Sequence, residues 1–335
     1  MSHTHVLAAV SRLDKVLIGL GAALAGLLLA LPLFGSPLIV DKLTLLMIYI
    51  ILAVSWNLLA GFAGLVSVGQ QAFIGLAGYF VLRLAEAGMA PFPALIAGAV
   101  VVLLVAWPLS WFVLRLKAAE FAVAMWVLAE AIRSVIMFDP LVQGETGRSL
   151  VTLNAIDADL RRTAIYLMAV ASAILVLAVS YRLLRGRLGG ESQAIRDDEE
   201  AAGSVGVSTM RVKRTIFLIS ALGCAIAGTL WLASAITYQP RAAFGINWSV
   251  FMLFMVLVGG LGSFLGPVLG ALLLFALQEA FGDFGAWYLT GIGCVAMLFA
   301  LYAPRGIIGL ITDRLGREPL SMRKELDVRS ERRGR

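Results

Sequence analysis

Charged and reactive side chains are scarce in this sequence of 335 residues. Only 14% of the residues are Asp, Glu, Lys or Arg, and there are two histidines and two cysteines. His3 and His5 lie near the N-terminus, while Cys224 and Cys294 lie in apolar runs without metal-ligand or redox spacing. The sequence also has no Walker-type phosphate loop, zinc-ligand cluster or nucleophile elbow. We therefore expect a protein that is neither an enzyme nor an ATPase, with no catalytic residue, no cofactor and no metal.

Apolar side chains dominate the chain instead. Hydrophobic residues make up 60% of it, and apolar runs of about 18 to 24 residues, long enough to cross a bilayer, recur from Val16 to Tyr302. The first run is long for a secretory signal, so we expect it to be retained as a span. The sequence thus predicts an all-α polytopic integral membrane protein, with a single transmembrane domain over 1–335 and about nine to ten transmembrane helices.

The placement of charge predicts the orientation. The net charge is +6, but the basic residues gather in the loop 182–214 and in the tail 304–335. This is the positive-inside pattern of membrane proteins, so both segments are expected to be cytoplasmic, and nucleic acid is excluded as a partner. The domain then divides into a first half over 16–181 with six spans and a second half over 215–303. Two cytoplasmic ends require an even number of spans between them, which predicts a helix break at the glycines of 259–267.

Two glycine-rich stretches interrupt the apolar runs, one after the second span and one after the eighth. Exposed backbone and amides are tolerated at membrane depth only where they are buried in protein or line a wet path. Their matching positions predict two inverted-repeat halves with a translocation path between them. For the glycine stretches, an equal alternative to a translocation path is a packing face between helices. For Glu130, the alternative to a path residue is a structural ion pair with Arg133. The expected path residues are Gly61, Gly64, Ser67, Gln70, Gln71, Glu130, Gly259, Gly260, Gly262 and Ser263.

The polar loop is expected to contain a short helix from Gln193 to Val205, ended by Gly203 and Gly206. Small apolar residues among charged ones suit a helix that docks closely into a groove on another protein. The alternative is a solvated helix without a partner. The expected docking residues are Ala194, Ile195, Arg196, Asp197, Asp198, Glu199, Glu200, Ala201, Ala202 and Gly206.

Three segments carry a resemblance to a known family. AIRDDEEAAGSVGV (194–207), NLLAGFAGLVSVGQQAFIGLAGY (57–79) and VGGLGSFLGPVLGA (258–271) resemble the permeases of ABC importers of the high-affinity branched-chain amino acid family, which also includes urea and amide permeases. Asp198 stands where the family has Asn, and Gln70 stands where His is common. In the loop 139–162, a degraded family motif leaves two alternatives open, a docking surface for an extracytoplasmic binding protein or a plain loop.

The resemblance implies an importer subunit in a bacterial inner membrane. It implies ABC ATPase subunits that dock on the 194–206 helix, a second permease subunit in a heterodimer, a periplasmic solute-binding protein and the lipid bilayer as partners. It also implies alternating access and branched-chain or related amino acids as cargo. Alternatives are a permease for urea or short amides, and a carrier driven by an ion gradient, for which Glu130 and Glu279 are the intramembrane candidates.

Overall fold

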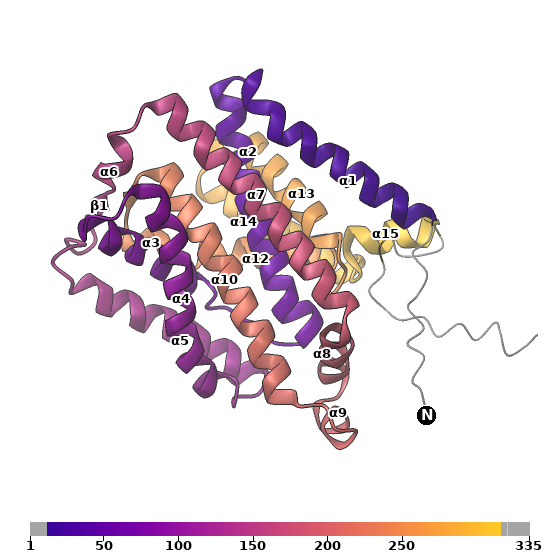
Figure 1. The fold of residues 1–335 in the computed structure, drawn as a ribbon. Helices are drawn as coiled ribbons and strands as arrows, with labels where there is room; N and C mark the ends of the chain where they lie inside the picture. Colours follow the sequence, from indigo (N-terminus) through magenta and orange to yellow (C-terminus); the bar gives the residue numbers. More distant parts are fainter. Residues whose placement is uncertain (1–11, 316–319, 321–335) are drawn as a thin grey trace, which may run out of the picture.

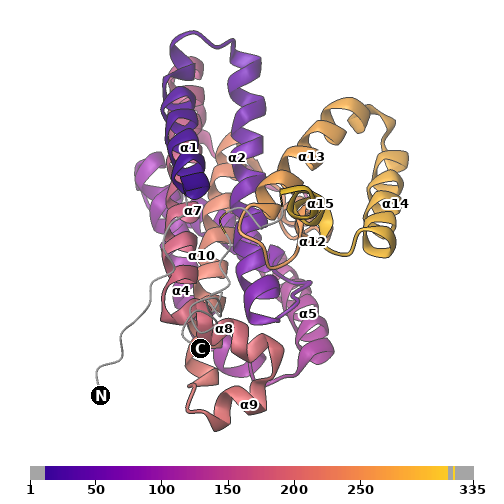
Figure 2. The same cartoon turned by 90° about the vertical axis from the view of Figure 1, so that its right-hand side faces the viewer.

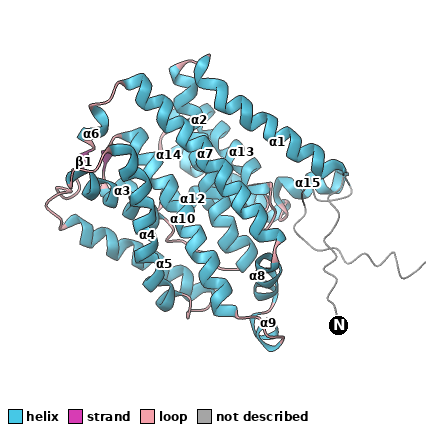
Figure 3. Ribbon diagram, viewed as in Figure 1, coloured by secondary structure: helices cyan, strands magenta, loops and turns pink. Residues whose placement is uncertain are grey.

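Helices make up nearly all of the fold. The computed structural model describes residues 12–315 and Leu320, and its only strands in that part of the chain are two short ones (Figures 1 and 3). The all-α class is confirmed. The elements are α1 (Arg12–Ala30), η1 (Leu31–Leu33), α2 (Pro37–Asn57), η2 (Leu58–Phe62), α3 (Gln71–Glu86), α4 (Pro91–Val113), α5 (Ala118–Met137), β1 (Arg148–Ser149), α6 (Val151–Asn154), α7 (Ala158–Arg185), α8 (Arg187–Asp197), α9 (Glu199–Ser204), α10 (Thr209–Ala235), β2 (Thr237–Tyr238), α11 (Pro240–Ala243), α12 (Asn247–Gly259), α13 (Gly266–Phe281), η3 (Gly282–Phe284), α14 (Ala286–Tyr302) and α15 (Gly306–Leu315).

Within the described residues, six helical segments are long and apolar enough to cross a membrane, and a bent pair formed by α14 and α15 raises the number to seven. Helix α3 is not among them because it has only 16 residues, starting after the first glycine stretch. Nine to ten spans stays a prediction. The six segments are Pro37–Phe62, Pro91–Val113, Ala158–Arg185, Thr209–Ala235, Pro240–Gly259 and Gly266–Phe284.

Helix α2 lies at the centre of the bundle. It packs against α7, α10, α12 and α13, and its side chains from Leu46 to Asn57 are all buried. Proline occupies the first turn of α2, α4 and α13, where a missing N–H leaves no helical hydrogen bond unmade. Small residues allow close contact with α10, because a Cβ atom on Gly223 would lie 1.9 Å from the Ser55 hydroxyl of α2.

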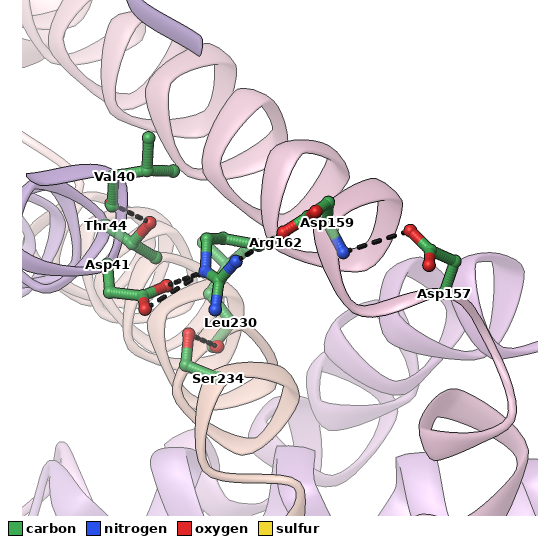
Figure 4. A network of polar contacts seen from close by, with 8 residues as sticks. All are labelled: Val40, Asp41, Thr44, Asp157, Asp159, Arg162, Leu230 and Ser234. Carbon is green, nitrogen blue, oxygen red and sulfur yellow. Dashed lines mark hydrogen bonds and ion pairs between the residues drawn. The ribbon is translucent and has the colours of Figure 1, made fainter. Parts of the chain in front are cut away.

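Two ion pairs hold the outer end of α2, which is the end away from α8 and α9 in Figure 1. Arg162 of α7 donates to both carboxylate oxygens of Asp41 at 3.1 Å and to Asp159 at 2.8 Å (Figure 4). Lys42 pairs with Glu279 of α13. The first residues of α2 are therefore tied to helices on two sides of the bundle.

The polar segment that follows α5 also lies at this outer end. Strands β1 and β2 pair antiparallel, with Arg148 opposite Tyr238 and Ser149 opposite Thr237. The pairing joins this segment to the end of α10. Helices α13, α14 and α15 stand to one side of the bundle (Figure 2), and α14 and α15 meet at an angle of 43°. The tail beyond Leu315, apart from Leu320, lies outside the described residues.

Candidate functional site

The expected docking helix is two helices rather than one. At Asp198 the backbone is extended, with φ −158° and ψ 109°, and this residue separates α8 from α9. Its carboxylate accepts hydrogen bonds from the N–H groups of Glu200 and Ala201, both at 3.0 Å, and so caps the first turn of α9. The prediction of one helix over 193–205 was wrong because this cap starts a new helix. Gly203 lies inside α9, and Gly206, with φ +90°, follows its end as expected.

The docking segment, defined here as residues 194–206, buries part of the face that was expected to meet a partner. Ile195 and Ala202 are buried inside this chain, with 4% and 3% of their surface exposed. Val205, by contrast, is 79% exposed. The exposed face is therefore small, apolar and acidic, and consists of Ala194, Asp197, Asp198, Glu199, Glu200, Ala201, Gly203, Ser204, Val205 and Gly206.

Ion pairing attaches α9 to the neighbouring span. Lys213 of α10 has only 7% of its side chain exposed, and its Nζ lies 2.5 Å from Glu199 Oε1. A buried ammonium group without a carboxylate partner would be strongly unfavourable. The pair therefore keeps α9 against α10, the helix that also packs along α2, α3 and α4.

Arg196 extends from α8 into the bundle. Its Nη1 donates a hydrogen bond of 2.8 Å to the carbonyl oxygen of Gly61, in the π-helical turn η2 where the first glycine stretch begins. The side chain passes Gly64, where an added Cβ would lie 3.0 Å from Arg196 Cγ. It also passes Gly262 of the second stretch, where an added Cβ would lie 3.0 Å from Nη1. One guanidinium group thus contacts both helix breaks.

The two glycine breaks interlock through Asn57, the last residue of α2. Its amide Nδ2 donates to the carbonyl of Ser263 at 2.8 Å, and its Oδ1 accepts from the N–H of Gly262 at 2.9 Å. A Cβ on Gly61 would lie 2.6 Å from the Gly262 nitrogen. Ser263 in turn caps the start of α13, since its hydroxyl accepts from the N–H of Gly266 at 3.1 Å. We call this packed region, residues 57–64 and 259–266, the glycine junction.

The expected polar path residues lie beyond the junction, in the chain between η2 and the start of α3. Gln71 accepts a hydrogen bond from Ser249 of α12, and Gln70 donates to Ser220 of α10 at 3.4 Å. The Ser67 hydroxyl accepts from the N–H of Gly69 at 3.3 Å. All three of these side chains are buried. Among the described residues, Gln70 Oε1 has no hydrogen-bond partner, so this buried group is the least satisfied part of the region.

Glu130 lies apart from the other expected path residues. It projects from α5 with 53% of its side chain exposed and pairs with Arg133 one turn later, while Arg133 is also 3.6 Å from Glu145. α5 packs against α3, α4 and α11, away from the glycine junction. The structure therefore brings together the glycines, Ser263 and Arg196, and leaves Glu130 outside that group.

Several residues of the site were not predicted from the sequence. Asn57 joins the two breaks, and Lys213 anchors α9, yet neither was expected as a site residue. An asparagine at the end of an apolar run is a usable signal, because a buried amide must find partners. Ser220 and Ser249 complete the amide contacts, but a serine within a span is too common to single out.

At the outer end, Asp139 follows α5 and gathers three donors. Tyr79 Oη donates at 2.6 Å and the N–H of Leu141 at 2.9 Å, and Arg83 forms an ion pair. These hydrogen bonds, led by that from Tyr79, hold the pKa of the Asp139 carboxyl below its usual value. The carboxylate therefore fixes the start of the outer loop to α3.

Residues 38–302, which include the glycine junction and the docking segment, match the protein family described as "Branched-chain amino acid transport system / permease component". The chain belongs to this family. The high-affinity branched-chain amino acid transport system permease protein LivM of Escherichia coli (strain K12) is 30% identical to this permease over 320 residues, which cover 88% of this chain and 75% of LivM.

More distant relatives cover less of this permease. A probable branched-chain amino acid transport permease protein LivM of Methanocaldococcus jannaschii is 25% identical over 212 residues, 58% of this chain and 61% of that protein. The permease protein BraD of Pseudomonas aeruginosa is 28% identical over 146 residues, 43% of this chain and 47% of BraD. No solved structure gives a significant match. Membership makes the chain a permease component of a transport system.

Proposed function

We propose that this permease is the membrane-spanning subunit of an ABC importer in a bacterial inner membrane. It would translocate branched-chain or related amino acids by alternating access, driven by partner ATPase subunits that dock on residues 194–206. The relatives named for branched-chain amino acid transport support the cargo class. The family pattern also supports a heterodimer with a second permease subunit and a periplasmic solute-binding protein at the opposite face.

One observation carries the mechanism: Arg196 of the docking segment bonds to Gly61 at the glycine junction. A partner that shifts α8 must move this guanidinium, because its stem is packed against Gly64 and its head against Gly262. Both breaks would then move together, since Asn57 ties one to the other. Helix breaks are where a span bends at least cost, so the junction is the natural hinge between two access states.

The exposed face of the docking segment suits a groove on an ATPase subunit. Ala194, Ala201 and Gly206 permit close approach, and the carboxylate of Glu200 would meet a basic side chain at its rim. Asp197 and Glu199 are already paired with Arg196 and Lys213 of this chain. Such charged contacts determine the orientation in which the partner docks, and they contribute less to its binding affinity.

Ion-gradient coupling receives less support from the geometry. Coupling carboxylates within spans are expected to be free to bind and release a cation. Glu130 is paired with Arg133, and Glu279 is paired with Lys42. Both candidate carboxylates are therefore already neutralised by neighbours within the chain.

Reconstitution of the complete importer tests the proposal. Proteoliposomes would contain this permease, the second permease subunit, the ATPase subunits and the binding protein, and uptake of labelled leucine would be measured with and without ATP. Uptake should require ATP and stop when the partner ATPase carries an inactivating substitution. Uptake that continues without the ATPase and collapses with an uncoupler would establish a gradient-driven carrier instead. Uptake of urea or acetamide but not leucine would show that the cargo is a short amide instead of an amino acid.

A further inference from the structure

A cluster of cations and tryptophans lies where the end of α4 meets the start of α10. The guanidinium carbon of Arg214 is 4.6 Å from the ring centre of Trp111 and 5.9 Å from that of Trp107. These distances fit cation–π contacts. The cluster is on the same end of the bundle as the docking segment, because α10 begins directly after it. It belongs neither to the docking face nor to the glycine junction.

Two further arginines flank this cluster. Arg115 lies in the turn two residues after the end of α4, and Arg211 precedes Arg214 by about one turn on α10. Because α4 and α10 pack along their lengths, with late α4 beside early α10, both arginines continue the cluster toward the same end of the bundle. Arg115 and Arg211 are exposed. None of the three arginines forms an ion pair with a carboxylate in the described part of the chain.

The surface beside the arginines is apolar and turned outward. Leu104 and Phe112 are each 72% exposed, Trp107 is 54% exposed and Trp111 is 47% exposed. In a chain that spans a bilayer, an outward stripe of this kind faces acyl chains, and tryptophans mark the level of the headgroups. Arg214 Nε is buried without a hydrogen-bond acceptor in the described residues. The cluster thus combines an acyl-facing wall with guanidinium donors that have no anionic partner.

We propose that this corner, made by Trp107, Trp111, Arg115, Arg211 and Arg214, binds the phosphate headgroup of an anionic phospholipid from the cytoplasmic leaflet. Guanidinium groups bind phosphate oxygens through charge-assisted, often bidentate hydrogen bonds. The apolar stripe along α4 receives the acyl chains. A protein partner with an apolar face would leave three guanidinium charges unpaired, so a lipid is the better match in charge. The assignment of the leaflet rests on the proposed orientation of the docking segment.

Lipid retention by the purified full-length permease tests this site without any ATPase partner. The protein would be exchanged into nanodiscs of phosphatidylcholine with phosphatidylglycerol, released, and its bound lipids counted by native mass spectrometry. The wild type should retain phosphatidylglycerol over phosphatidylcholine. The double variant Arg211→Gln/Arg214→Gln should bind phosphatidylglycerol about tenfold more weakly, the loss expected on removing charge-assisted hydrogen bonds. Arg182→Gln, which removes an exposed cytoplasm-side charge outside the cluster, should leave retention unchanged.

Three results would overturn the site. These are equal retention of phosphatidylglycerol by the wild type and the double variant, displacement of the lipid by inorganic phosphate alone, and efficient photocrosslinking from position 111 to the second permease subunit instead of to lipid. Thermal unfolding of the double variant within a few degrees of the wild type would show that the fold is intact. Because uptake is not measured, a failure here leaves the proposed transport function standing, and a failure of ATP-driven uptake leaves the lipid site standing.

Discussion

Arg196 donates a hydrogen bond to the carbonyl oxygen of Gly61 across 135 residues of sequence. The donor belongs to the docking segment and the acceptor to the first helix break, so one contact joins the surface proposed for the ATPase to the interior of the bundle. Since the same guanidinium also lies against Gly262, the contact reaches both breaks. The proposed transport mechanism therefore depends on this side chain more than on any other in the segment.

Replacing Arg196 with Gln should uncouple ATP hydrolysis from uptake. The shorter amide cannot reach Gly61 and Gly262 together, so α8 can move without moving the junction. We expect uptake in proteoliposomes to fall at least about tenfold, the effect of losing a charge-assisted hydrogen bond, while the ATPase subunits still bind. Arg187→Gln is the matched control, because Arg187 lies on the same helix with 88% of its side chain exposed. Equal uptake by the two variants would contradict the coupling role.

Alanine at Gly61 should destabilise the permease. The added methyl would lie 2.6 Å from the Gly262 nitrogen and 2.2 Å from Asn57 Oδ1, and neither group can withdraw without breaking the link between the breaks. Overpacking of this kind raises the free energy of the folded state by about 1–3 kcal/mol, visible as a lower unfolding temperature in detergent. Gly203→Ala in α9 meets nothing within 4 Å and should be neutral or slightly stabilising. A Gly61→Ala protein as stable as the wild type would show that the junction is loose.

Tryptophan at positions 201 and 202 should have different effects, although the two residues are neighbours. Ala202 is buried, so Ala202→Trp should lower the amount of folded protein. Ala201 is exposed, so Ala201→Trp and Glu200→Arg should leave the permease folded and in the membrane but abolish ATPase binding and uptake. Copurification of the ATPase subunits with each variant measures the difference. Normal copurification with both Ala201→Trp and Glu200→Arg would remove the docking role of this face.

Asp139 should make the stability of the outer loop depend on pH in the acid range. Its pKa is lower in the folded protein than the usual value of 3.8, so the carboxylate stabilises the fold fully above that value. That stabilisation is lost as the pH falls through the lowered folded pKa. The difference in unfolding temperature between wild type and Asp139→Asn should therefore be constant from about pH 7 to about pH 5, and should shrink below pH 3.8. A difference that grows on acidification would assign the opposite sign to the shift.

Much of this architecture can be predicted from the sequence, because a membrane-spanning helix must have a minimum length and few polar side chains. The apolar runs predict the helices, and the glycines of 61–64 and 259–262 correctly predict two breaks. The division of the docking segment at Asp198 was missed, although an aspartate followed by Glu199 and Glu200 is a usual start of a helix. The target of Arg196 could not be predicted, because it depends on how α8 packs across the end of α2. Burial of Ala202 likewise follows from tertiary contact rather than from residue type.

Helix α2 is held at both extremities by different neighbours. Near its start, Asp41 forms an ion pair with α7 and Lys42 forms one with α13. At its end, Asn57 donates a hydrogen bond to Ser263, just before α13. A helix of 21 residues is about 31 Å long, which is about the thickness of the hydrocarbon core of a bilayer. If the Asp41 ion pair and the Arg196–Gly61 hydrogen bond are coupled through α2, that coupling is reciprocal, so a change at either contact alters the other. Under the proposed function, α2 would then connect the face that meets the binding protein with the face that meets the ATPase.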